Sequence, residues 1–241
     1  HVPLALGLVG ADGKDVPLQL EGESAAAGSS RVLSMKQAEE RFVFVNVAAK
    51  PVPSLARGFS APVILKYDYD EAALTHLMAH DSDAFNRWEA GQRLASELIL
   101  RAANAPRDRG TAELPPGFVE AFARVLEGEA GPGDPAFAAE ALALPSETTL
   151  AEQMEIVDPD AIHAVRNDLK RGLATALRVH LLEIHRSHDV PGPYSPDAVS
   201  AGKRALRNAA LALLMELDEP EARALCMKQF EDADNMTDAL A

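Results

Sequence analysis

The 241-residue sequence contains very little cysteine and no long hydrophobic run. Its single cysteine, Cys226, excludes an internal disulfide framework and fits a reducing compartment. No stretch approaches the roughly 18 uninterrupted apolar residues of a transmembrane helix, and the opening lacks the pattern of a secretory signal. Hydrophobic residues nevertheless make up 47% of the chain, which is enough to bury a substantial core.

Basic residues are scarce relative to acidic ones, and the net charge is -14. Residues 1–69 hold seven basic and seven acidic side chains, whereas residues 70–241 hold 16 basic and 30 acidic ones. The negative field of the second part repels phosphate backbones and anionic lipid. We therefore expect neither nucleic acid nor a membrane as a partner.

The two ends of the sequence both lie within patterns that look unfinished. His1 stands directly before an apolar run, and the last residues predict the start of a helix, with Thr237 as its cap and Asp238 near the positive end of its dipole. We therefore expect this chain to be a piece of a longer protein.

Short strand signals fill the first part of the chain. They lie at residues 4–9, 16–20, 31–35, 41–45 and 63–67, separated by Gly, Ser and Pro, and the first two predict a hairpin. Pro51, Pro53 and Pro62 suit edges and turns rather than a central strand. Several short strands without an intervening helix predict a small antiparallel sandwich.

Helical periodicity begins at Asp70 and continues to the end. Three apolar stripes have helical spacing: Phe85, Trp88, Ala95, Leu98 and Ile99; Leu169, Leu173, Leu177, Leu181 and Ile184; and Leu206, Ala210, Leu213 and Leu214. Breaks at 104–116, 131–135, 144–146, 157–159 and 188–196 leave roughly seven helices. Such helices in stacked antiparallel pairs predict an alpha solenoid, although no fixed-period repeat is present.

The predicted fold class is α+β with two domains. A small antiparallel β-sandwich is expected at residues 1–69 and the first part of an all-α, solenoid-like domain at residues 70–241. Asp70 is a plausible N-cap for the helix that follows. No flexible linker separates the two, which predicts a direct strand-to-helix junction.

Histidine pairs and the cysteine are the first candidates for chemistry. His76 and His80 share one helical face, but Leu77 occupies the position where a metalloprotease has its glutamate, so ordinary histidines are favoured over a metal site. His180, His185 and His188 gather near a helix end, where cations suit the dipole, and the same interpretation applies to them.

The remaining candidates also favour structural roles. Cys226 lies in an apolar helical context, which favours a buried structural thiol over a nucleophile. Trp88 is predicted in the core, and Glu39 and Glu40 point to different faces in any regular element. The segment at 131–133, Gly-Pro-Gly, lacks the Lys and Ser or Thr of a phosphate loop. No catalytic, cofactor-binding or metal-binding residue is therefore predicted.

Several blocks together resemble bacterial aminopeptidase N, of the M1 family of zinc metallopeptidases. They lie at residues 42–47, 50–63, 77–90, 203–209 and 228–240, in the family's order and at matching spacing. The resemblance implies an Ig-like sandwich followed by the start of a C-terminal helical domain. The family's HExxH motif with its distant glutamate and its GxMEN motif belong to an upstream catalytic domain, and no position here matches either of them.

The resemblance implies that the parent protein removes N-terminal amino acids from peptides in the bacterial cytoplasm. A zinc-activated water would attack the scissile carbonyl, with a glutamate as general base. This piece would be inactive alone, and would support the catalytic domain and help to cap its chamber. Its partners would be the catalytic domain and the remaining C-terminal helices of the same chain.

The charge asymmetry supports an alternative from another class. A stand-alone helical-repeat scaffold could present its acidic face to a basic protein partner. An acidic peptidase chamber that attracts free N-terminal amines, or simply a solvated helix surface, would explain the same acids.

Overall fold

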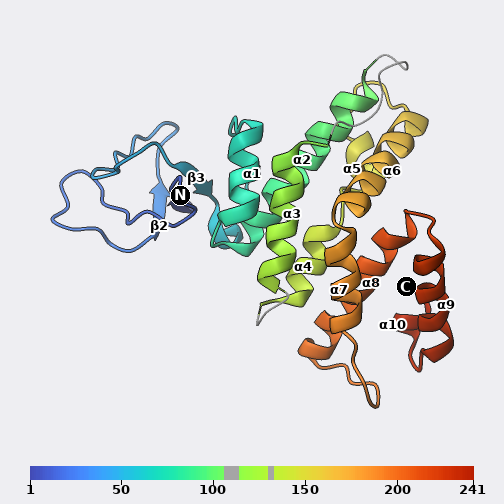
Figure 1. Ribbon diagram of the computed structural model, residues 1–241. Coiled ribbons are helices and arrows are strands. Elements are labelled where there is room, and N and C mark those ends of the chain that lie inside the picture. The colour runs from blue at the N-terminus through green and yellow to red at the C-terminus, as the bar shows by residue number, and fades with distance from the viewer. Residues whose placement is uncertain (106–113, 130–132) are drawn as a thin grey trace. The chain divides into compact units, whose positions relative to one another are not determined.

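The computed structural model describes residues 1–105, 114–129 and 133–241 and divides into two compact units, His1–Leu94 and Ala95–Ala241 (Figure 1). The division between the two units falls inside the helix at residues 84–103, whereas the change from strand-like to helical sequence pattern falls at residue 70. The expected domain boundary after Tyr69 stays a prediction.

A three-stranded antiparallel sheet forms the first part of unit one. Its strands are β1 (Val2–Val9), β2 (Ser30–Met35) and β3 (Val52–Leu55), in the order β2-β1-β3. In the register, Leu4 faces Leu33 and Leu6 faces Leu55. Leu6, Leu8, Leu18 and Leu33 form its buried core, and Pro53 lies in an edge strand, as its missing N–H requires.

Three of the expected strands are not ladder strands in the structure. In the predicted hairpin only Val9 and Asp15 form a bridge, because Pro17 cannot donate to a ladder and Leu18 instead bonds to the backbone of Gly28. Phe44 makes a single bridge to Leu20, and residues 63–67 are extended without a ladder. Strand-like composition predicts extended backbone, but it does not supply a partner.

Helices follow the sheet along the chain, which confirms the predicted order of a small antiparallel sheet and a helical part. The predicted direct strand-to-helix junction is wrong, because β3 ends at Leu55 and residues 60–70 belong to no helix or strand. The short 3-10 helix η1 (Arg57–Phe59) precedes α1 (Glu71–His80) and α2 (Ala84–Ala103). The Asp70 side chain accepts a hydrogen bond from the Ala73 N–H, 2.7 Å away, so Asp70 is the N-cap that the sequence predicts.

The later helices begin where the sequence places its punctuation. They are α3 (Pro116–Glu129), α4 (Pro135–Leu142), α5 (Glu147–Ala151), α6 (Pro159–Ala176), α7 (Arg178–Ser187), α8 (Ala198–Met215), α9 (Pro220–Asp232) and α10 (Met236–Ala239). Several of them start at proline, whose fixed φ suits the first helical position. Asp134, Asp158 and Asp197 cap α4, α6 and α8.

The described residues contain ten helices rather than about seven. The short helices α5 and α10 account for part of the difference, and a break at Leu177 (φ -98°, ψ 8°) divides the expected single stripe between α6 and α7. All five residues of that stripe are nevertheless at most 2% exposed. Within unit two, α8 lies against α4, α6, α7 and α9.

Two local expectations need correction. The cap of α10 is Asn235, whose Oδ1 accepts from the Asp238 N–H at 3.0 Å, whereas Thr237 lies inside the helix. Trp88 and Cys226 are partly exposed rather than buried. Within the described ranges, no helix combines the length and the hydropathy that crossing a membrane requires.

Candidate functional site

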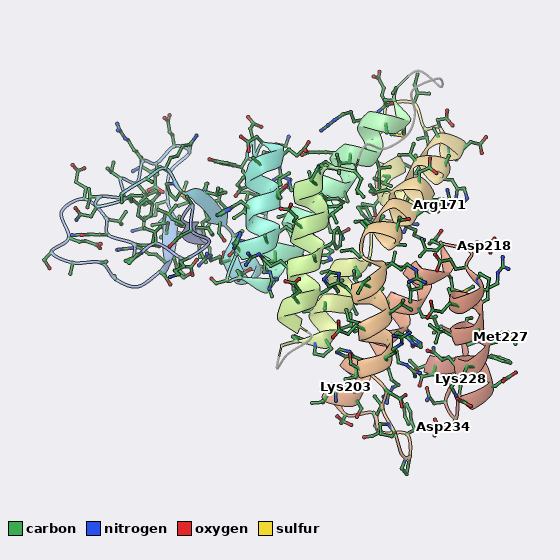
Figure 2. All side chains as sticks on the ribbon, in the orientation of Figure 1. Arg171, Lys203, Asp218, Met227, Lys228 and Asp234 are labelled. Carbon is green, nitrogen blue, oxygen red and sulfur yellow. The ribbon has the colours of Figure 1, made fainter. Side chains whose placement is uncertain are left out.

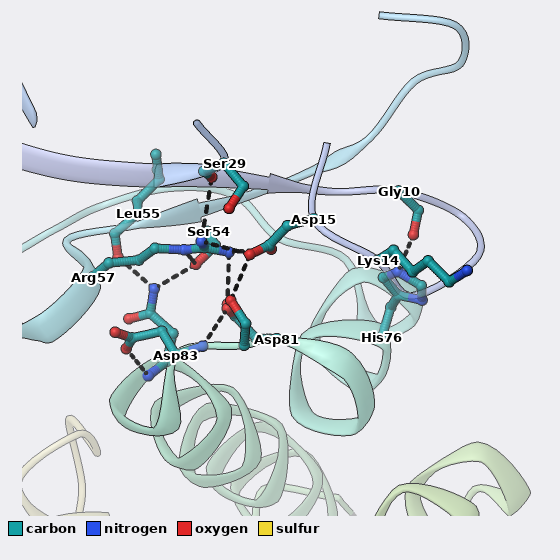
Figure 3. A network of polar contacts seen from close by, with 12 residues as sticks. Gly10, Lys14, Asp15, Ser29, Ser54, Leu55, Arg57, His76, Asp81 and Asp83 are labelled. Carbon is teal, nitrogen blue, oxygen red and sulfur yellow. Dashed lines mark hydrogen bonds and ion pairs between the residues drawn. The ribbon is translucent and has the colours of Figure 1, made fainter. Parts of the chain in front are cut away.

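Unit one contains a buried cluster of charged side chains centred on Arg57 (Figure 3). The Arg57 side chain is 6% exposed, and that of its partner Asp81 is fully buried. Buried charges are rare in proteins unless they are paired, so this cluster is the most unusual polar feature of the unit.

The backbone around Arg57 is folded in an uncommon way. Ala56 and Phe59 have φ of 59° and 51°, and Gly58 has φ of 60°. Such values are disfavoured for residues with a side chain and persist only where the surroundings hold them. The tight turn places Arg57 directly after strand β3, with its guanidinium inside the unit.

Arg57 uses its guanidinium to connect three separate segments. Its Nη2 donates to Asp15 Oδ1 at 2.7 Å and its Nη1 to Asp15 Oδ2 at 3.2 Å, which is a two-pronged pair. Nη2 also donates to Asp81 Oδ1 at 3.1 Å, and Nε donates to the Ser54 hydroxyl at 2.8 Å. The turn after β1, strand β3 and the α1–α2 loop therefore share one cation.

The residues after Asp81 extend the cluster into the start of α2. Asp81 Oδ1 accepts from the Asp83 N–H, and Asp83 in turn accepts from the backbone N–H groups of Gly58 and Asn86. The Asn86 side chain donates to the Ser54 hydroxyl at 2.8 Å and to the Leu55 carbonyl at 3.0 Å. These bonds fix the N-terminus of α2 against β3 and η1.

The two carboxylates that bind Arg57 have opposite electrostatic environments. Burial alone raises the pKa of Asp15, but hydrogen bonds from Arg57 and Ser82 and the Arg57 charge outweigh it, so the net pKa lies below the usual value. For Asp81, deeper burial dominates, and the Ser54 hydroxyl, the Asp83 amide and the Arg57 charge offset it only in part, so its pKa is raised. Burial therefore works against the ionised form of Asp81, and the Arg57 charge is one of three contacts that favour that form.

The chemistry of this cluster is positional rather than catalytic. Arg57 is always protonated, and its donors are committed to Asp15, Asp81 and Ser54. The residue pattern alone did not predict this cluster. A signal was present, since Arg57, Asp81 and Asp83 are charged residues within two of the blocks that carry the family resemblance.

The histidine pair on α1 is placed as its spacing predicts. The rings of His76 and His80 lie 4.8 Å apart between centroids, and His76 Nε2 is 2.8 Å from the Gly10 carbonyl oxygen. His76 is therefore tied to the end of β1 rather than directed at an open site.

The three histidines at residues 180–188 do not gather at one helix end, because His180 lies in the first turn of α7 and His185 and His188 lie at its last turn and cap. They contact different groups. His180 pairs with Glu127 at 3.3 Å, His185 Nε2 lies 3.2 Å from Gln229 Oε1, and His188 Nδ1 lies 3.1 Å from the Ile184 carbonyl. The structure does not direct these rings at one point.

His185 provides a pH-dependent contribution to stability. Burial lowers its pKa, and the nearby Arg207 and Arg186 charges act in the same direction, against Gln229 and Asp189. Because the unfolded chain then binds the proton more readily, this contribution is present above about pH 6.5 and is lost as the pH falls through the folded pKa. We expect His185→Gln to lose less unfolding free energy than the parent between about pH 7 and about pH 5, measured by urea denaturation. Parallel profiles for the two proteins would contradict this assignment.

The other sequence candidates do not assemble into a site. Glu40 accepts from the Lys36 N–H, and Cys226 is half-buried on α9. Gly131 and Pro132 lie outside the described residues. Within residues 1–105, 114–129 and 133–241, no three His, Cys, Asp or Glu side chains are grouped so that they could hold a metal ion.

An apolar pocket of about 240 Å³ lies beside the charged cluster in unit one. It is lined in part by the exposed side chains of Phe59, Val63 and Ile64, of which Ile64 is 91% exposed. The pocket borders the segment at 63–67 that has no ladder partner.

Two family models match the chain, one after the other. Residues 1–68 match the DUF3458 domain of unknown function, described as an Ig-like fold. Residues 71–241 match the DUF3458_C domain of unknown function, described as ARM repeats. Together they match the predicted order of an Ig-like sandwich and a helical array.

Curated relatives share the chain over nearly its whole length. Aminopeptidase N of Escherichia coli (strain K12) is 42% identical over 100% of this chain, that of Caulobacter vibrioides is 38% identical over 98%, and that of Haemophilus influenzae is 31% identical over 100%. The chain spans only 27%, 26% and 27% of those relatives.

A solved structure agrees with these relatives. The crystal structure of Legionella pneumophila aminopeptidase A in complex with aspartic acid matches 99% of this chain and 27% of its own, with a TM-score of 0.76 at 26% sequence identity. Sequence and structure comparisons thus both match this chain to about a quarter of the length of an aminopeptidase.

Proposed function

Since this chain belongs to the DUF3458_C family and carries the Ig-like DUF3458 domain before it, and matches aminopeptidase N along its length, we propose that it is a non-catalytic structural segment of a zinc metalloaminopeptidase. The parent would belong to the M1 class, remove N-terminal amino acids from peptides, and act in the bacterial cytoplasm. This segment would support the catalytic domain and help to cap the chamber.

One observation carries this proposal: the relative matches the whole of this chain, but this chain makes up only part of the relative. The Escherichia coli relative matches 100% of this chain, whereas the chain accounts for 27% of the relative. A peptidase activity of the relatives can therefore reside in the remaining length. The other parts of such a protein, which are the catalytic domain and further C-terminal helices, are the proposed partners of this segment, and peptides are the proposed substrate.

The residues that the structure describes do not form a zinc site of their own. The described ranges bring no suitable group of three ligands together, and the histidines of α1 and α7 contact backbone or single side chains. We therefore assign the proposed zinc to another part of the parent and derive no catalytic step through this chain.

What this chain supplies is a firm junction inside unit one. Arg57 and its carboxylate partners join strand β3, the turn after β1 and the α1–α2 loop. A support needs such a junction, because the geometry of an active site depends on elements that do not move relative to one another.

We expect the purified 241-residue chain to leave an aminoacyl p-nitroanilide uncleaved and to carry no stoichiometric zinc, because its described residues form no metal-binding group. The measurements are release of nitroaniline and zinc analysis after dialysis. A catalytically active aminopeptidase N from Escherichia coli would serve as the positive control. Zinc-dependent turnover by the chain itself would contradict the proposal.

A reading of the source gene on both sides of the codons for this chain tests the parent protein directly. In-frame HExxH, a distant glutamate and GxMEN upstream of His1 would support the aminopeptidase. An open reading frame limited to these residues would overturn it and favour the acidic scaffold. That scaffold would capture a basic protein partner and release it at high salt.

A further inference from the structure

A second pocket, of about 250 Å³, lies within unit two and is remote in sequence from the Arg57 cluster. It lies among the α7–α8 connection, helix α8 and the α9–α10 connection. Its volume is below the roughly 300 Å³ at which pockets for drug-sized ligands begin, so only a small ligand fits.

Two arginines one helical turn apart on α8 line the inner part of this pocket. Arg204 is 3% exposed, its Nη2 donates to the Ser195 carbonyl, and its guanidinium lies 4.7 Å from the centre of the Tyr194 ring. The Arg207 side chain is 19% exposed and pairs with Asp189 at 3.4 Å. Among the described residues, the buried Nε atoms of both arginines have no hydrogen-bond acceptor.

The guanidinium groups on this wall select a particular chemical group. A guanidinium presents its N–H groups as a planar fork that matches the two oxygens of a carboxylate. The Nε atoms are themselves closed to solvent, so a ligand would meet the guanidinium groups through their Nη atoms, and the Arg207 side chain is the more open of the two at 19% exposure. The inner wall is therefore suited to a carboxylate.

The opening of the same pocket carries the opposite charge. Asp189 and Asp232 have side chains that are 63% and 64% exposed and pair with Arg207 and Lys228, whereas the exposed Asp234 adds a further negative charge. Figure 2 shows Asp234 just beyond the end of α9. A simple anion would be repelled at this rim, whereas an ammonium group would be attracted.

We propose that this pocket binds a small zwitterion, a free α-amino acid or a dipeptide, with its carboxylate toward Arg204 and Arg207 and its ammonium toward the aspartate rim. The charges of such a ligand match both parts of the pocket at once. A bare metal cation would meet the two arginines, and a bare anion would meet the aspartates. The site is separate from the proposed peptidase activity and stands without it.

The test is a titration of the 241-residue chain followed by the Nε–H signals of its arginines in nitrogen-proton NMR spectra. The probes are L-leucine and the dipeptide leucyl-glycine, compared with L-leucinamide, which lacks the carboxylate, and N-acetyl-L-leucine, which lacks the ammonium. We expect saturable shifts of the Arg204 and Arg207 signals with a zwitterion and at least about tenfold weaker binding of both analogues. Leucine and leucyl-glycine distinguish a free amino acid from a peptide.

Variants complete the test. Arg207→Lys keeps the positive charge but loses the planar fork of N–H donors. Asp234→Asn keeps the shape of the side chain but loses its negative charge at the pocket opening. Each substitution should weaken zwitterion binding several-fold. The matched control is Arg223→Lys, because Arg223 lies on α9 outside the pocket and pairs with Asp218. Absence of a saturable shift overturns the proposal, and so does equal binding of either analogue.

Discussion

We expect Arg57→Leu to destabilise the chain by about 3–5 kcal/mol, which is the cost of breaking a buried ion pair by removing one partner. The substitution leaves Asp81, with a fully buried side chain, and Ser54 without the guanidinium. It also falls within a turn in which Ala56 and Phe59 have positive φ, an uncommon conformation for residues with a side chain. Urea denaturation followed by circular dichroism measures the change in unfolding free energy. Because the chain has two compact units, the unfolding of unit one is followed separately by the fluorescence of Trp88, which lies in that unit.

A matched control distinguishes burial from charge pairing. Arg31 makes a two-pronged pair with Glu23, but the two side chains are 25% and 31% exposed. Arg31→Leu should therefore cost only a small fraction of the Arg57→Leu loss, because solvent screens an exposed pair. In a chain that already carries Asp81→Asn, Arg57→Leu should cost less unfolding free energy, because no buried carboxylate is left unpaired. Equal losses for Arg31→Leu and Arg57→Leu would contradict the role assigned to the buried cluster.

The second large effect is expected at Gly7, in the middle of the central strand β1. A Cβ atom added to Gly7 would lie 2.0 Å from Arg57 Cζ, so Gly7→Ala cannot coexist with the guanidinium in its observed place. Overpacking alone costs about 1–3 kcal/mol, and displacement of Arg57 adds part of the buried-pair loss. We expect a total near 3 kcal/mol, measured by the same denaturation.

The control for Gly7 is the same substitution where space is available. Gly128 lies near the end of α3, and an added Cβ there has no neighbour within 4 Å among the described residues outside its own helix backbone and its two chain neighbours. Gly128→Ala should stabilise the chain by about 0.5–1 kcal/mol, because alanine loses less backbone entropy in a helix. If Gly7→Ala were as well tolerated as Gly128→Ala, the close approach of strand and guanidinium would be wrong.

Helix starts and buried faces were predictable because their signals are local. Asp70 caps α1 through the amide of a residue three positions later, and Pro159 opens α6 directly after its cap Asp158. The stripe from Leu169 to Ile184 is buried as its spacing requires. Such patterns involve residues within one or two turns of each other, so the sequence alone contains the whole interaction.

Strand pairing and the break between α6 and α7 were less predictable. Residues 41–45 and 63–67 have the composition of strands, yet pairing depends on which backbone edge is free elsewhere in the fold. The apolar stripe continues without interruption through Leu177, so its spacing gives no sign that α6 ends there and α7 begins. Likewise Asn235 and Thr237 are both good caps by residue type, and only the backbone selects Asn235.

The sequence by itself determined the order of a small antiparallel sheet and a helical array, the burial of the apolar stripes at residues 169–184 and 206–214, and the family to which the chain belongs. Only the tertiary structure decided that Arg57 meets Asp15 and Asp81, 42 and 24 positions away, and that Arg204 and Arg207 share a pocket with the α9–α10 aspartates. The physical reason is the distance along the chain over which each interaction acts. Propensity, capping and periodicity act between neighbours in the chain, whereas buried charge pairs form between segments that meet only after the chain has folded.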